Sequence, residues 1–139
     1  MSVSKKKQNE FDLIFLPVDN CNFLLDINLL RNLFNSDYYG YFIEYIKNKI
    51  KIIVLNNNNF NLHIYINSSN TSDLYYYDKI IIFVKLLHEY IDNLANIYVY
   101  ESSYLFVNLI SLLSNSLNID INKKIIYESK ENYKSKFNN

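Results

Sequence analysis

Strand-like and helix-like hydrophobic patterns alternate along the second half of the chain, and this alternation constrains the fold more than any other feature. Residues 62–66 alternate apolar with polar side chains, which is the period of a β-strand. Residues 78–94 repeat apolar side chains at helical spacing, which predicts the most regular helix of the chain. The same patterns predict a strand at 96–100, a helix at 104–117 and a strand at 119–127. Such alternation predicts an α/β fold, in which helices pack on a mixed sheet that contains parallel strands.

A run of four asparagines, Asn56–Asn59, separates two apolar segments in the middle of the chain. Lys49–Leu55 is rich in β-branched residues and is predicted to be a strand. Asparagine tolerates left-handed backbone angles and hydrogen-bonds its own backbone, so the run is typical of a turn. Together with residues 62–66, these segments predict a β-hairpin that precedes the helix at 78–94.

The first part of the chain has weaker patterns. Residues 11–18, FDLIFLPV, predict a buried strand that Pro17 ends. Asp26–Phe34 predicts a short helix, and residues 38–46 fit a helix or a strand equally well. We therefore expect a flexible basic N-terminus at 1–10, a strand–helix extension at 11–48, an α/β core domain at 49–129 and a polar tail at 130–139.

The composition indicates an AT-rich genome, such as that of an organelle, a parasite, an endosymbiont or a large virus. Asparagine, isoleucine, tyrosine and lysine are abundant, whereas the chain has 1 Gly, 1 Pro and no Trp. The formal charge is zero, with 14 basic and 14 acidic residues, which argues against a protein that simply coats nucleic acid. Lysines gather at both ends, where they either contact phosphate or are solvated.

Residues that carry chemistry are few. One glycine cannot make a Gly-rich phosphate loop. Cys21, His63 and His88 have no partners at metal-ligand spacing, so no metal or cofactor is expected. A single cysteine excludes an internal disulfide framework and indicates a reducing compartment. No apolar run has the length that crosses a bilayer, and no signal peptide is apparent, so no membrane partner is expected.

The two most apolar helices, expected at 78–94 and 104–117, carry only narrow polar stripes. Each must therefore be covered on more than one side. Either a partner in a large assembly covers them, or the N-terminal helix of the same chain does so.

A nuclease is one alternative function. A strand with Asp12, a hairpin and then helix–strand–helix–strand resembles the ribonuclease H architecture, whose members hold two divalent metals with carboxylates. Asp12, Asp73 or Asp78, and Glu101 would be the ligands. These residues have no recognised spacing, and each also fits a structural role.

From residue 49 onward, the order of elements resembles the universal small-subunit ribosomal protein S-eleven family. Ile52–Asn56 is similar to the family strand TIVTITD, Asn57–Asn61 to its N-G-N turn, and Leu62–Ser69 to a second strand that ends in W-S-S. Asn96–Ser103, NIYVYESS, is similar to VEVYVKGPG. Tyr104–Leu117 and Ile119–Ser129 match the helix and the strand that follow in the family. The resemblance covers residues 49–129.

This resemblance implies a non-enzymatic structural component of a mitochondrial small ribosomal subunit, which binds small-subunit rRNA and neighbouring ribosomal proteins on the platform. It implies no small-molecule substrate. By position, the rRNA contacts fall on Ser68, Ser69, Asn70, Ser102, Ser103, Lys130, Lys134 and Lys136. An interaction subunit of another large complex is the first alternative, and the metal-dependent nuclease is the second.

Overall fold

A five-stranded mixed sheet, in the order β1-β2-β3-β4-β5, lies at the centre of the molecule. The computed structural model describes residues 4–56, 58–65, 77–100 and 121–137, together with residues 108, 111, 112, 114 and 115. The elements are α1 (Lys5–Ile14), β1 (Phe15–Pro17), β2 (Asn22–Asp26), α2 (Ile27–Leu30), η1 (Arg31–Leu33), α3 (Tyr39–Leu55), β3 (Phe60–Tyr65), α4 (Tyr77–Glu89), β4 (Leu94–Tyr100), η3 (Asn122–Lys124), β5 (Ile125–Glu128) and α6 (Lys130–Phe137). β1 is antiparallel to β2, and the other neighbouring strands are parallel. The predicted mixed α/β class is therefore confirmed.

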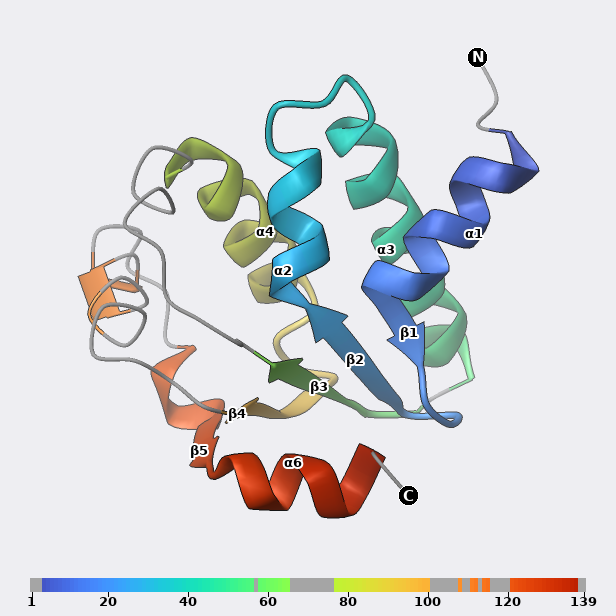
Figure 1. Cartoon of the computed structure of the whole chain (residues 1–139). Helices are drawn as coiled ribbons and strands as arrows, with labels where there is room; N and C mark the ends of the chain where they lie inside the picture. Colours follow the sequence, from blue (N-terminus) through green and yellow to red (C-terminus); the bar gives the residue numbers. More distant parts are fainter. Residues whose placement is uncertain are drawn as a thin grey trace.

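The two faces of the sheet are covered differently. α1, α2, α3 and α4 lie on one face, and α6 lies alone among the labelled helices on the opposite face (Figure 1). The helix-covered face carries the main core, where Leu25, Leu62, Ile97 and Val99 are almost fully buried. Because side chains alternate along a strand, their neighbours in sequence point to the opposite face. We call this opposite face, which α6 partly covers, the open face.

The hairpin predicted at residues 49–66 is wrong, because residues 39–55 form the helix α3. Its buried residues follow one helical face: Tyr39, Phe42, Ile46, Ile50 and Ile53. A β-branched composition is only a weak preference for strand, and burial of this continuous face outweighs it. The asparagine run ends the helix, since the backbone N–H groups of Asn56 and Asn58 donate to the carbonyl of Ile53. Ile52–Asn56 therefore does not supply the first strand of the S-eleven pattern.

The structure has a hairpin, but it lies near the N-terminus, where β1 pairs with β2. The strand expected at 11–18 begins only at Phe15, because the residues before it form α1. Ser4 caps α1 by accepting a hydrogen bond from the Lys7 N–H at 3.2 Å, so the segment predicted to be flexible is helical from Lys5. Phe11 and Ile14 anchor this helix, with 1% and 6% of their surface exposed.

The tail expected at 130–139 is helical over Lys130–Phe137. Ser129 begins this helix α6 by accepting a hydrogen bond from the Asn132 N–H at 3.2 Å. Tyr133 and Phe137 are spaced by one helical turn and lie on the sheet, which is why a polar segment becomes ordered. The boundary expected between residues 48 and 49 falls inside α3, and β1 and β2 belong to the same sheet as β3–β5.

The elements predicted around β3, α4, β4 and β5 are confirmed with shifted ends. The helix expected at 104–117 lies mostly outside the described residues. α4 packs against the sheet and α3, where the Tyr39 hydroxyl donates to the Lys79 carbonyl at 2.7 Å and Lys47 pairs with Glu89 at 3.7 Å. The chain thus covers the inner side of α4, whereas Ile82 on the outer side is 44% exposed. Within the described segments, no helix has the length and apolar character that crossing a membrane requires.

Candidate functional site

Three rows of side chains cross the open face from strand to strand. The strand registers align Asn22, Asn61 and Asn96 in the first row; Leu24, His63, Tyr98 and Ile126 in the second; and Asp26, Tyr65, Tyr100 and Glu128 in the third. Neighbours within a row lie on strands about 4.8 Å apart, so their side chains are in contact. The middle of this face is therefore both aromatic and rich in hydrogen-bonding groups.

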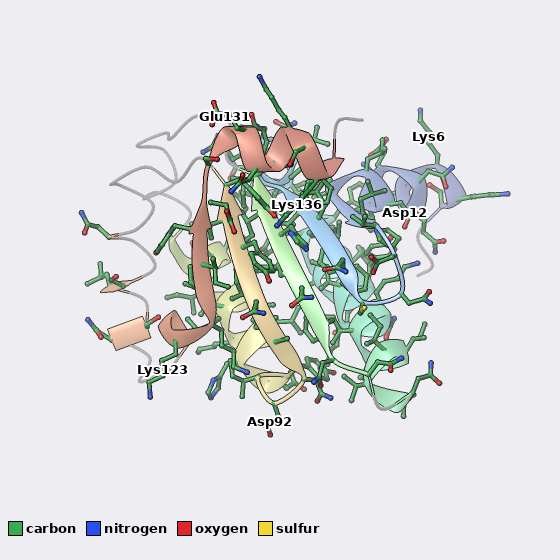
Figure 2. The ribbon with its side chains drawn as sticks, turned by 90° about the horizontal axis from the view of Figure 1, so that it is seen from below. Lys6, Asp12, Asp92, Lys123, Glu131 and Lys136 are labelled. Carbon is green, nitrogen blue, oxygen red and sulfur yellow. The ribbon has the colours of Figure 1, made fainter. Side chains whose placement is uncertain are left out.

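The aromatic rings of α6 rest on the third row and on part of the second. Tyr133 stacks on Tyr65, with ring centroids 4.0 Å apart and an interplanar angle of 14°. Phe137 meets the His63 ring edge-to-face at 5.2 Å and the Tyr100 ring at 6.0 Å. Figure 2 shows α6 crossing one end of the strands, and none of the helices that the structure describes covers the other end of the open face.

His63 is the centre of a hydrogen-bond network on this face. Its Nδ1 lies 2.9 Å from the Tyr100 hydroxyl, and its Nε2 lies 2.9 Å from the side-chain oxygen of Asn22. An amide oxygen only accepts, so Nε2 carries the proton, and Nδ1 accepts from Tyr100. Burial lowers the pKa of His63 to about 4, and the nearby Lys136 ammonium adds to this shift while Asp19 opposes it. His63 is therefore neutral at pH 7, and neither ring nitrogen is free to act as a base.

The network continues from Asn22 into the turn between β1 and β2. The Asn22 amide nitrogen donates to both carboxylate oxygens of Asp19, at 2.9 and 3.0 Å. The Cys21 backbone N–H donates to the same carboxylate, and this bond together with those from Asn22 lowers the pKa of Asp19. Asn61 donates to the Asn22 oxygen at 3.1 Å. These bonds hold the turn against β2 and β3.

At its other end, the network reaches α6. The Lys136 ammonium donates to the Tyr100 hydroxyl at 3.4 Å and lies 4.8 Å from the centroid of the Tyr98 ring. Burial, and next the charge of Glu128, raises the pKa of Tyr100 to about 12, so its hydroxyl stays protonated and donates to His63. Lys136 reaches over the sheet, whereas Glu131 lies at the opposite end of α6 (Figure 2). The chain of bonds thus runs from a cation on α6 to the Asp19 carboxylate.

A polar cavity of about 330 Å³ opens on this face, between the β1–β2 turn and the last turn of α6. Its lining combines three rings, two amides, a carboxylate, an ammonium group and one aliphatic side chain: His63, Tyr98, Phe137, Asn22, Asn61, Asp19, Lys136 and Val18. The side-chain oxygen of Asn61 is buried and has no hydrogen-bond partner. A smaller cavity of about 70 Å³ lies on the other side of the sheet, and its described lining is apolar except for Tyr39, whose hydroxyl is already bonded.

The structure brings only part of the predicted RNA contacts to this face. Lys136 lies over the sheet, Lys134 is exposed on α6, and Lys130 begins that helix. Ser68, Ser69, Asn70, Ser102 and Ser103 lie outside the described residues.

Sequence reasoning missed the network around His63. Its signal is the period-two placement of polar and aromatic residues on two parallel strands: His63 and Tyr65 on β3, and Tyr98 and Tyr100 on β4. Abundant tyrosine and asparagine conceal that signal.

The carboxylates of the nuclease alternative do not come together in the part of the chain that is described. Asp12 lies on α1, where its carboxylate is 4.0 Å from the Lys49 ammonium, so its predicted place on a strand is wrong. Asp78 lies in the first turn of α4, and Asp73 and Glu101 fall outside the described residues. Over the described segments, no group of three His, Cys, Asp or Glu side chains is placed to hold a metal ion.

The sheet order and the hydrogen-bonded open face provide two features by which this chain can be compared with known proteins. The sheet places four parallel neighbours in sequential order beside one antiparallel edge strand. The open face carries a neutral histidine between a tyrosine and an asparagine. No family model matches the chain, and no match is found among curated proteins or solved structures.

Proposed function

We propose that this protein is a non-enzymatic RNA-binding subunit of a ribonucleoprotein, and that single-stranded RNA lies on the open face of its sheet. The observation that carries the proposal is the half-buried Tyr98 ring on β4 with the row of asparagines beside it, on the part of the open face that α6 leaves uncovered, next to the lysines of α6. Flat rings on a sheet stack unpaired bases, and lysines beside them bind the phosphates.

The charges on this face set how tightly RNA is held. α6 contributes Lys130, Lys134 and Lys136 against one acidic residue, Glu131. Asp26 and Glu128 lie in the row of side chains beneath α6. A surface of this kind binds phosphate through a few contacts, so we expect moderate affinity rather than the coating of long RNA.

The ribosomal part of the proposal is narrower. We propose the small subunit of a mitochondrial ribosome as the particle, with rRNA and neighbouring ribosomal proteins as partners. Its support is the strand–helix–strand order from β3 to β4, followed by β5, which resembles the S-eleven family. Ile52–Leu55 belongs to α3, so the ribosomal part of the proposal rests on the elements from β3 to β5 alone.

The salt dependence of RNA binding tests the proposed surface. Three phosphate contacts to single-stranded RNA predict a slope of about −2 for the logarithm of the association constant against that of the salt concentration. Charge reversal of Lys130, Lys134 and Lys136 to glutamate is expected to abolish this slope and weaken binding. The matched control reverses three exposed lysines in the helical layer: Lys5, Lys6 and Lys51. An equal loss of RNA affinity in both variants would contradict an RNA surface on the open face.

The particle is tested separately, by purifying the native complex and identifying its RNA and proteins. Small-subunit rRNA and ribosomal proteins are expected to co-purify with the chain. Their absence from a complex that retains the chain would reject the ribosomal assignment and leave RNA binding to be judged by the salt slope.

A second candidate function is that of a protein-interaction subunit. Leu13 on α1 and Ile52 and Leu55 on α3 are 65%, 58% and 81% exposed. The two helices lie side by side, with Asp12 and Lys49 paired between them. Large exposed apolar side chains of this kind favour contact with a protein. Leu55→Asp would then release the chain from its complex without changing RNA affinity.

A further inference from the structure

The polar cavity beside the last turn of α6 has the dimensions of a ligand site. Its volume of about 330 Å³ lies within the usual range for small-ligand pockets. The β1–β2 turn forms one wall, the strands form the floor, and α6 forms the opposite wall. Residues from four separate parts of the chain therefore converge on one opening.

The floor of the cavity is held in place by bonds that are already made. Asn22 uses its nitrogen for Asp19 and its oxygen for His63 and Asn61. The groups that can bind a ligand are those whose hydrogen-bonding capacity is not used in this floor.

Three kinds of group in the cavity can still bind a ligand. The side-chain oxygen of Asn61 accepts no hydrogen bond, but it is buried, so the amide must turn before a ligand can reach it. The Lys136 ammonium has three donors, of which one points to the Tyr100 hydroxyl at 3.4 Å. Phe137 and Tyr98 contribute flat rings to the lining. The site therefore offers an acceptor, a cation and aromatic surface within one cavity.

We propose that this cavity binds one unpaired nucleobase of the RNA strand. The base lies against Phe137 or Tyr98, a base N–H donates to Asn61, and Lys136 binds the adjoining phosphate. This inference rests on the proposed RNA-binding function, since it assigns one base of that RNA to a defined site. It adds a requirement for a base that phosphate contacts alone would not impose.

An abasic oligomer tests whether bases contribute to binding on the open face at all, and a substitution in the cavity then tests where they bind. An eight-nucleotide RNA of mixed sequence is compared with a ribose–phosphate oligomer of equal length without bases, by fluorescence anisotropy on the full chain. We expect the abasic oligomer to bind about tenfold more weakly, because stacking on even one ring has this effect. This arm uses the unmodified protein, so its result does not depend on the folding of a variant.

A substitution in the cavity then tests whether the base contributes its affinity there. Asn61→Leu is expected to weaken binding of the normal oligomer about fivefold to tenfold, with no change for the abasic one. Asn48→Leu is the matched control, because Asn48 is exposed on α3, on the other side of the sheet. Thermal unfolding verifies that each variant is folded before binding is compared.

The outcomes are distinct. If the normal and abasic oligomers bind equally well, the base site is wrong and no base stacks on this face, while RNA binding through the phosphates stands. The base site is also rejected if a folded Asn61→Leu variant binds the normal oligomer as the unmodified chain does. If neither oligomer binds, the proposed function fails and the base site fails with it.

Discussion

The buried neutral His63 predicts that the stability of this protein falls as the pH drops below 7. An unfolded histidine has a pKa of about 6.5, whereas burial lowers that of His63 in the fold to about 4. The unfolded state therefore binds more protons than the folded state between these values, and stability decreases with falling pH in this window. Asp19, Lys136 and Tyr100 face His63. The stability that neutral His63 contributes to the fold is fully present only above the pKa of the unfolded histidine.

The magnitude follows from the two pKa values. Each unit of difference corresponds to 1.36 kcal/mol, so the full effect is about 3 kcal/mol, of which about 2 kcal/mol is lost between pH 7 and pH 5. Most carboxylates titrate below this interval, so His63 dominates it. Loss of 2 kcal/mol is large against the 5–15 kcal/mol that stabilises a typical domain.

Urea unfolding at pH 7, 6 and 5, followed by circular dichroism, measures this dependence. The free energy of unfolding of the unmodified chain is expected to fall by about 2 kcal/mol across the interval. That of His63→Gln is expected to change little, whatever its absolute value, because the titrating group is gone. His88→Gln is the matched control, since His88 is exposed on α4. Equal pH dependence in the unmodified chain and in His63→Gln would refute the buried neutral histidine.

Three further predictions concern the fold. Ile50→Ala is expected to lower the free energy of unfolding by about 2–5 kcal/mol, and Ile52→Ala by less than about 1 kcal/mol, because Ile50 is fully buried and Ile52 is 58% exposed. Urea titration checks this pair, and similar costs would indicate a strand, in which residues two apart share a face. The Asp26 carboxylate caps α2 by accepting the Leu29 N–H at 3.1 Å. Asp26→Ala is therefore expected to lower the free energy of unfolding by about 1 kcal/mol, and Asp26→Asn by much less. Equal losses of stability in the two variants would contradict the cap. Tyr133→Ala is expected to speed amide hydrogen exchange in α6 but not in α3, because a helix of 8 residues depends on its packing; unchanged exchange in α6 would contradict that dependence.

Local periodicity was sufficient to predict β3, α4, β4 and β5, with shifted ends. β3 and β4 are recognised by alternation, and α4 is recognised by its apolar side chains at helical spacing. α3 was not recognised, because a segment made of isoleucine, tyrosine and valine has apolar residues at both helical and strand spacing. Its assignment to a helix depends on burial against other elements, which local sequence does not contain.

The candidate site depends on contacts that are distant in sequence. Asn22 and His63, which share a hydrogen bond, are separated by 41 residues, and His63 and Tyr100 by 37. Only the parallel register of β2, β3 and β4 brings them into one face. The family resemblance implies Lys136 as an RNA contact, but its position over Tyr98 follows from the docking of α6, in a segment predicted to be a polar tail.

Photo-crosslinking to an RNA oligomer that contains 4-thiouridine, followed by mass spectrometry, tests the central claim most directly. Cross-links are expected on peptides from β3, β4 and α6, in particular at Tyr98 and Phe137. Cross-links confined to α1, α3 and α4 would contradict an RNA surface on the open face of the sheet.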